Sequence, residues 1–231
     1  MVFFDAGMTL IQPVPEFRSG ILQVLIDNGC AISREQVEKH SDDAVNFLIS
    51  EINSGRRYAV SDEADEEFWG DVYERLLLRL GINGSARDLG LKIYYFYRQH
   101  HSFDVFPNSL ATVKTLAHSG FKLGIISNFS TMLDGVFRLR QMRDYFDPFI
   151  VSADVNLMKP DAEIYELAME RAGVAPEDCI MVGDNPVDDV KGAALAGVRG
   201  VLIDRFNRYP HAPQPRITSL AQLPGLLKLP E

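Results

Sequence analysis

The amino-acid sequence predicts an α/β fold: a doubly wound, Rossmann-like parallel sheet into which an α-helical domain is inserted. Two observations carry this prediction. After Pro107, short apolar runs alternate with helical stretches, which is typical of a parallel sheet covered by helices on both faces. Before Pro107, a single apolar run at residues 2–4 precedes a long and almost purely helical segment.

The helical segment extends from about residue 16 to residue 101. Its tetrapeptide Ser33-Arg34-Glu35-Gln36 is a capping-box pattern, which predicts the start of a helix. Gly81 has the place of a C-terminal cap. Three stripes of apolar residues at helical spacing support the prediction: Val37, Ala44, Phe47 and Leu48; Phe68, Trp69, Val72, Tyr73, Leu76, Leu77 and Leu80; and Leu89, Ile93, Phe96 and Tyr97.

The second half of the chain supplies the other expected strands, which are the apolar runs 122–127, 148–152, 179–183 and 200–204. Helices are expected between them, at 109–119, 131–140, 161–172 and 187–196, with Gly173 and Gly197 closing the last two. The proline-rich segment 209–216 is predicted to be a surface loop. Since the strand at 2–4 belongs to the same sheet, we expect two domains: a core of residues 1–13 and 104–231, and an inserted helical domain of residues 14–103.

The composition argues against several classes of function. The chain has 231 residues and a net charge of -9, whereas proteins that bind nucleic acids or anionic membranes rely on an excess of Lys and Arg. The only cysteines, Cys30 and Cys179, form no CxxC pair, so neither a zinc site nor a disulfide framework is indicated. No basic leader and no apolar stretch of roughly 18 residues is evident, so we expect a cytoplasmic protein.

Polar side chains follow four segments of the predicted sheet. Ligands bind at the carboxyl ends of the strands in an open parallel sheet, so these groups are expected at one edge although they lie far apart in sequence. Their types suit a phosphate and a metal ion. They are Asp5 and Thr9, then Ser127 and Asn128, then Lys159, and finally Asp184, Asp188 and Asp189.

This set of residues indicates phosphoryl chemistry. Carboxylates such as Asp5 attack phosphorus to form aspartyl-phosphate intermediates. Mg²⁺ prefers oxygen ligands, which Asp5, Asp184 and either Asp188 or Asp189 would supply. Lys159 would add a positive charge. Hydroxyl groups of Ser127 and Thr9, with backbone amides of the loop that contains Gly7, would donate to phosphoryl oxygens.

The same stretches resemble the motifs of the haloacid dehalogenase-like (HAD) hydrolase superfamily. An apolar strand ending in D-x-D-x-T stands here as FFDAGMTL, and a strand ending in Ser or Thr stands as GIISN. The motif lysine is found in MKPDAEIYELA, and the acidic motif in IMVGDNPVDDVKGA. The resemblance covers nearly the whole chain, and the helical insertion is similar to a C1-type cap domain.

The resemblance implies a role for each matching residue. Asp5 would be the nucleophile and a metal ligand, with Lys159, Thr9 and Ser127 as the other catalytic residues. The phosphate would contact Ala6, Gly7, Ser127, Asn128 and Lys159. Mg²⁺ would be held by Asp5, the backbone carbonyl of Gly7, Asp184 and Asp189, with Asp188 as the alternative to Asp189. The substrate would be a small, anionic molecule, and the protein a monomer or a homodimer.

Gly7 departs from the superfamily pattern, in which the residue two positions after the nucleophile is an aspartate that acts as general acid and base. Loss of such a group typically lowers a rate by about 10²–10⁴-fold. A phosphatase with this site would therefore need a substrate with a good leaving group, or an acid from the cap, where His40, His100 and His101 are available.

Two alternatives remain open at this point. One is a haloacid dehalogenase or a phosphonatase, since these branches also lack the second aspartate. The acid-rich GDNPVDD argues against the dehalogenase, which does not use Mg²⁺, and a phosphonatase would need a cap lysine, for which only Lys39 and Lys92 are available. The other alternative is a protein with weak or no catalysis that binds a phosphorylated ligand in a regulatory role.

Overall fold

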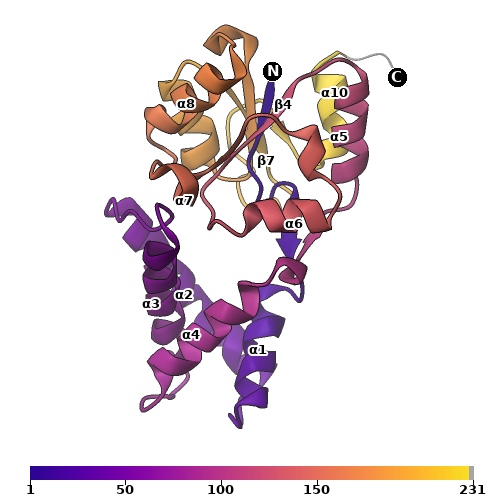
Figure 1. Ribbon diagram of the computed structural model, residues 1–231. Coiled ribbons are helices and arrows are strands. Elements are labelled where there is room, and N and C mark those ends of the chain that lie inside the picture. The colour runs from indigo at the N-terminus through magenta and orange to yellow at the C-terminus, as the bar shows by residue number, and fades with distance from the viewer. Residues whose placement is uncertain (229–231) are drawn as a thin grey trace. The chain divides into compact units, whose positions relative to one another are not determined.

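The computed structural model describes residues 1–228, and the chain divides into two compact units (Figure 1). One unit, called here the α/β unit, contains Met1–Gln12 and the described chain from Val105 onward. The other, called the helical unit, is formed by Pro13–Asp104. Among the described residues, no helix combines the length and the apolar character needed to cross a membrane.

A six-stranded parallel sheet forms the centre of the α/β unit, in the order β5-β4-β1-β6-β7-β8. The predicted α/β fold with a parallel sheet is confirmed, and all five predicted strands are present. The first strand of the chain lies between β4 and β6, so Phe3 pairs with Gly124 on one side and with Met181 on the other. The strands are β1 (Val2–Phe4), β4 (Leu123–Ser127), β5 (Phe149–Val151), β6 (Ile180–Gly183), β7 (Arg199–Ile203) and β8 (Arg216–Ile217).

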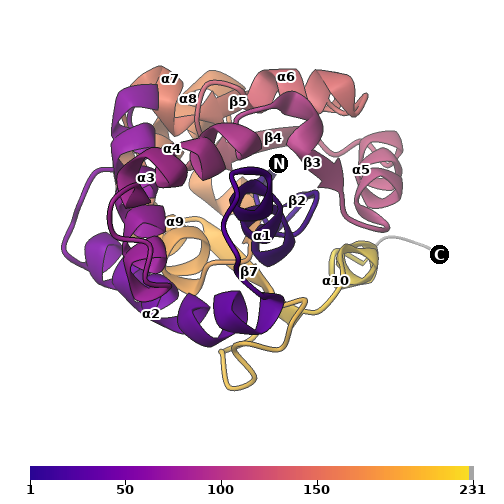
Figure 2. The same ribbon diagram turned by 90° about the horizontal axis from the view of Figure 1, so that it is seen from below.

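Helices cover both faces of this sheet because successive side chains of each strand point to opposite faces. Phe3 is fully buried against Ile164 and Tyr165 of α8. Phe4 is also buried and packs edge-on against Phe146, with 6.2 Å between the ring centroids. In both views α5 and α10 lie side by side and apart from α8 (Figures 1 and 2). The helices of this unit are α5 (Ser109–His118), α6 (Leu133–Leu139), α7 (Ser152–Val155), α8 (Ala162–Ala172), α9 (Gly192–Leu195) and α10 (Leu223–Leu226).

Two predicted segments of the α/β unit differ from the structure. The helix expected at 187–196 begins as a π-helix, Pro186–Lys191, and becomes α-helical only in α9. Its start is fixed by Asn185, whose side-chain oxygen accepts the backbone N–H groups of Val187 and Asp188. The segment 209–216 was predicted to be a loop throughout, but its last residue, Arg216, is the first residue of β8.

The helical unit consists of four helices around an apolar core. The predicted capping box is confirmed: the Ser33 hydroxyl accepts the N–H of Gln36, whose side chain accepts the N–H of Ser33. Gly81 follows the third helix with a φ of 83°, a left-handed conformation that favours glycine. The helices are α1 (Phe17–Asp27), α2 (Arg34–Asn53), α3 (Asp62–Arg79) and α4 (Ala86–Tyr97).

A separate two-stranded sheet lies where the chain passes from one unit to the other. Its strands are β2 (Ile11–Pro13) and β3 (Phe103–Val105), which the sequence did not predict. These segments therefore connect the units through two neighbouring strands. Short 3₁₀ helices complete the secondary structure, at His100–Ser102, Arg143–Tyr145, Pro176–Asp178 and Leu220–Gln222.

Candidate active site

The carboxyl ends of the three central strands bring Asp5, Ser127 and Asp184 together. Asp5 directly follows β1, the middle strand of the three, and its backbone N–H donates to the carbonyl of Val182 at 2.9 Å. Ser127 is the last residue of β4, and its hydroxyl donates to Oδ1 of Asp5 at 3.1 Å. Both side chains are buried. The parallel sheet thus brings these three residues close together although they lie far apart in the sequence.

Lys159 is the cation at the centre of the site. Its side chain is 2% exposed, and Nζ donates to Oδ1 of Asp5 at 2.8 Å and to Oδ1 of Asp189 at 2.6 Å. Burial alone would lower the pKa of Lys159, but the two carboxylates outweigh burial and raise this pKa well above its usual value. The lysine is therefore charged and holds both carboxylates.

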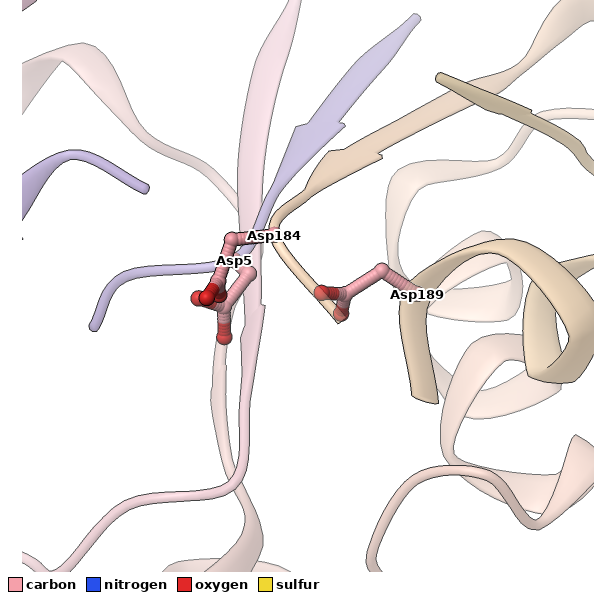
Figure 3. A group of neighbouring side chains, drawn as sticks. All are labelled: Asp5, Asp184 and Asp189. Atoms are coloured by element: carbon pink, nitrogen blue, oxygen red, sulfur yellow. The ribbon is translucent and has the colours of Figure 1, made fainter. Parts of the chain in front are cut away.

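Three carboxylates form a cluster here, Asp5, Asp184 and Asp189, with one oxygen of each within 4.8 Å of the others. Figure 3 shows the side chain of Asp189 directed toward Asp5 and Asp184. Burial first, and then the charges of Asp5 and Asp189, raise the pKa of Asp184 well above its ordinary value. Burial likewise raises the pKa of Asp189 to about 6, although Lys159 opposes the shift.

The donor atoms of this cluster fit a hard divalent cation. Carboxylate oxygens are the ligands that Mg²⁺ prefers, and Mg²⁺ sites commonly use one or two carboxylates with waters and substrate oxygens. Among the residues that the structure describes, Lys159 is the one cation hydrogen-bonded to the cluster, so a surplus of negative charge remains in a largely buried place. A divalent ion bound by Asp5, Asp184 and Asp189 would neutralise that surplus.

Asp188 and Asp189 occupy different environments although they are adjacent. The Asp189 carboxylate accepts Lys159 Nζ and, through Oδ2, the backbone N–H of Asn185 at 2.9 Å. The Asp188 carboxylate is also buried and accepts Nδ2 of Asn185 at 3.0 Å. Burial raises the pKa of Asp188 to about 7. Asp189 belongs to the carboxylate cluster and Asp188 does not, among the residues that the structure describes.

The loop after Asp5 is tightly folded. The carbonyl of Ala6 accepts the N–H groups of Leu10 and Ile11, at 2.9 and 3.0 Å. Gly7, partly exposed, forms a β-bridge with Ile11. Thr9 is completely buried, and its hydroxyl has no hydrogen-bond partner within residues 1–228. In this conformation the Thr9 hydroxyl is therefore not accessible to a phosphate.

The side chain of Asn128 is hydrogen-bonded to the protein backbone. Its Nδ2 donates to the carbonyl of Lys159 at 2.8 Å, and its Oδ1 accepts the backbone N–H of Lys159 at 2.8 Å. Both polar atoms of the amide are thereby engaged. The phosphate contact predicted for Asn128 stays a prediction, and in this structure its side chain is bonded to the backbone of Lys159.

Arg205 supports the nucleophile loop, and the sequence analysis missed it. One guanidinium nitrogen donates to the carbonyl of Thr9 at 2.7 Å, and the guanidinium carbon lies 4.2 Å from the ring centroid of Phe106. Burial lowers the pKa of Arg205, and the charge of Asp184 opposes that shift. The rule that polar residues after strands meet at one edge would have identified Arg205, because it directly follows the predicted strand 200–204.

The candidate acids and lysines of the helical unit are mostly at its surface. His100 and His101 are exposed, and His40 is half-buried. Lys39 is exposed, as is Lys92, whose Nζ donates to Oδ1 of Asn28 at 2.5 Å. Neither lysine is desolvated, and a Schiff-base lysine is usually activated by burial.

Comparisons with known proteins identify the family of the chain. Residues 1–197 match the protein-family model of haloacid dehalogenase-like hydrolases. The glyceraldehyde 3-phosphate phosphatase of Methanothermobacter thermautotrophicus is 30% identical over 209 residues, which are 88% of this chain and 84% of that protein. The (S)-2-haloacid dehalogenase 1 of a Pseudomonas species is 32% identical over 166 residues, which are 70% of this chain and 72% of that protein.

Solved structures show the same fold. The crystal structure of a HAD phosphatase from Thermococcus onnurineus has 28% sequence identity and a TM-score of 0.64, and the match covers 98% of this chain and 96% of that chain. The family match and the shared fold thus lead to the same assignment. The chain belongs to the haloacid dehalogenase-like hydrolases and is a hydrolase enzyme of that family.

Proposed function

We propose that this hydrolase is a Mg²⁺-dependent phosphatase that acts on a small phosphorylated metabolite through Asp5. The observation that carries the proposal is the state of the Asp5 carboxylate. Its Oδ1 accepts both Ser127 and Lys159, while its Oδ2 makes no hydrogen bond to any residue that the structure describes. A carboxylate with one oxygen held and the other unengaged is oriented to attack phosphorus.

The neighbouring residues have distinct parts in this proposal. Lys159 and Ser127 orient the nucleophile and donate to phosphoryl oxygens as charge develops on them. Asp5, Asp184, Asp189 and the backbone carbonyl of Gly7 would hold Mg²⁺. When bound, Mg²⁺ would screen the repulsion between an anionic nucleophile and an anionic phosphoryl group.

In this proposal the helical unit serves as a C1-type cap. Because position 7 is a glycine, an acid supplied by the cap would matter for catalysis. Gly7 provides no side chain that could protonate a leaving alcohol. Either the leaving group departs without a proton, or the helical unit supplies an acid, for which His40, His100 and His101 are the candidates. We therefore expect acyl and aryl phosphates to be hydrolysed better than alkyl phosphates.

A 2-haloacid dehalogenase is the second candidate, favoured by the 32% identity to the Pseudomonas dehalogenase. A halide leaves without a proton, which also suits Gly7. The buried carboxylate cluster argues against it, because displacement of a halide by Asp5 requires neither Asp184 nor a metal ion. The exposed state of Lys39 and Lys92 speaks against a phosphonatase that forms a Schiff base.

The experiment compares three kinds of substrate in one buffer, with Mg²⁺ and with EDTA. Purified protein is given an acyl or aryl phosphate, an alkyl phosphate and a 2-haloacid, and release of phosphate or halide is measured. We expect EDTA-sensitive release of phosphate from the acyl or aryl phosphate, at a rate about 10²–10⁴-fold above that from the alkyl phosphate.

The other outcomes identify the alternatives. Halide release that EDTA does not affect would establish the dehalogenase and contradict the phosphatase. No turnover of any substrate, combined with a rise in the unfolding temperature on addition of inorganic phosphate, would indicate a protein that binds a phosphorylated ligand without hydrolysing it.

A further inference from the structure

Position 7 faces an aromatic ring. The backbone of Gly7 is not in the left-handed region, so its conformation is open to other residues. A Cβ added there would lie 3.7 Å from Cε2 and 3.9 Å from Cδ2 of Phe129, and no other atom of the described chain outside its immediate neighbours would lie within 4 Å. There is room for the Cβ itself, and a longer side chain directed toward Phe129 would meet the hydrocarbon of its ring.

The backbone that carries this ring is fixed by Ser152, a fully buried residue at the start of α7. The Ser152 hydroxyl accepts the N–H of Phe129 at 3.0 Å and donates to the carbonyl of Phe129 at 3.2 Å. The N–H of Ala153 adds a contact to the same carbonyl at 3.4 Å. Both backbone polar groups of Phe129 are thus bound to the segment after β5.

The preceding residue is fixed from the other side. Asn128 makes two hydrogen bonds of 2.8 Å to the backbone of Lys159, and Lys159 holds the nucleophile Asp5. Movement of the Phe129 ring away from Gly7 by a shift of the backbone would break hydrogen bonds to Ser152 and strain those to Lys159. The backbone that carries the ring is therefore fixed beside Gly7.

We propose that Phe129 is a specificity-determining residue that closes the Gly7 side of the nucleophile with a hydrocarbon face. The proposal rests on the phosphatase function proposed above and names its substrate class, the acyl phosphates. A carboxylate leaving group is stable as an anion and needs no donor, so an apolar wall is no disadvantage in the step in which the leaving group departs. An alkoxide needs a proton, which a hydrocarbon face cannot donate.

The reaction balances without an acid at position 7. In the first step an oxygen of Asp5 forms a bond to phosphorus, the bond between phosphorus and the acyl oxygen breaks, and the carboxylate leaves with the electron pair. In the second step water attacks phosphorus, the bond between phosphorus and Asp5 breaks with its electron pair left on the Asp5 carboxylate, and one proton stays on the attacking oxygen while the other passes to a second phosphate oxygen. The products are one carboxylate and one inorganic phosphate, and Asp5 returns to its initial state.

The test compares the parent with Gly7→Asp, Phe129→Ala and the double variant on aryl phosphates of increasing leaving-group pKa. The slope of log kcat/KM against that pKa is the readout. We expect a steep slope for the parent and both single variants, and a shallow slope for the double variant, with a gain of about 10²-fold on the poorest leaving groups. Phe121→Ala is the matched control, because Phe121 is also half-buried and precedes the amino end of β4.

Two results would overturn the role of Phe129. One is a slope for Gly7→Asp alone as shallow as that of the double variant, since the ring would then be no obstacle. The other is a steep slope for the double variant together with unchanged folding. If the parent hydrolyses none of the aryl phosphates, the phosphatase proposal fails. A measurement of stability then tests separately whether Phe129 confines position 7.

That measurement is urea unfolding of the same four proteins. If Phe129 confines position 7, Gly7→Asp lowers the unfolding midpoint more in the parent than in the Phe129→Ala background. The reason is that the effects on stability of substitutions at two contacting residues are not additive. Equal losses in the two backgrounds would show that the ring and position 7 do not interact, and would overturn the inference regardless of turnover.

Discussion

The two units each bury a carboxylate, but they compensate its charge in different ways. In the α/β unit, Asp189 is 1% exposed and receives Lys159 Nζ at 2.6 Å. In the helical unit, Asp65 is 7% exposed and accepts the Tyr94 hydroxyl at 3.0 Å, and its nearest cation, Arg98, lies 3.9 Å away. Burial raises the pKa of each carboxyl to about 6.

The difference lies in how many charges share a cation. Around Lys159, three carboxylates gather within 4.8 Å of one another, so a single ammonium group leaves negative charge unbalanced. One acid, Asp62, is among the causes of the raised pKa of Asp65; Arg98 lies within 4 Å of both acids, and the Tyr94 hydroxyl donates to Asp65. Burial of one acid is thus a matter of packing, whereas a surplus of charge in a buried cluster indicates a place for a ligand.

Asp5→Asn should have the largest effect and tests the functional side of the comparison. The amide cannot act as a nucleophile, so turnover of the best substrate should fall by at least about 10⁴-fold, while the fold persists because one charge leaves a crowded cluster. Kinetics of phosphate release measure the first effect and circular dichroism the second. Asp178→Asn makes the same change at an exposed position before β6 and serves as control. Activity within tenfold of the parent would exclude Asp5 as the nucleophile.

Lys159→Met should have the largest effect on stability. The substitution leaves Asp5 and Asp189 without their common partner in a buried place, and the loss of one member of a buried ion pair typically costs about 3–5 kcal/mol. Urea unfolding in EDTA gives the free energy of unfolding. Lys191→Met, at an exposed lysine next to the cluster, is the matched control. Equal unfolding midpoints for the two variants would mean that the ion pairs contribute no net stability.

Asp65→Asn should have a smaller, pH-dependent effect. The folded-state pKa of Asp65 lies above its ordinary value, so the neutral form stabilises the fold; this contribution is fully present below pH 3.8 and is lost as the pH rises through about 6. A shift from 3.8 to about 6 corresponds to at most about 3 kcal/mol.

The variant should therefore gain stability relative to the parent between about pH 4 and about pH 7.5. Chemical unfolding at both pH values measures this gain, and Asp42→Asn, at an exposed position in α2, controls for the loss of a charge. A difference between variant and parent that does not change with pH would show that Asp65 is not held in its neutral form.

Sequence patterns predicted the sheet well because its strands are buried on both faces. The run Leu123–Ser127, for example, is buried throughout and has no polar side chain before Ser127, and this signal needs no alignment. The strands that were missed have two or three residues and contain Gln, Pro, Asp or Arg. The π-helix Pro186–Lys191 was also missed, because six residues are too few to distinguish its period from that of an α-helix.

For the site, the strand-end rule brought Asp5, Ser127, Lys159, Asp184 and Asp189 to one place, and the structure gathers these side chains. Their catalytic and metal-binding roles stay predictions. The rule could not reveal which way a side chain turns. The Asn128 amide turns to the Lys159 backbone, and the Thr9 hydroxyl is enclosed. Bonds from a side chain to a distant backbone, such as that of Ser152 to Phe129, leave no trace in sequence spacing.

The central place of β1 has a consequence for synthesis of the chain. β1 is made before both of its neighbours in the sheet, which begin at Leu123 and Ile180, so it has no strand to pair with until the helical unit and β4 have been synthesised. The helical unit lies between these segments in the chain and is held by contacts within Pro13–Asp104. The helical unit can complete its core before Ser127 and Lys159, which bind the Asp5 carboxylate, have been synthesised.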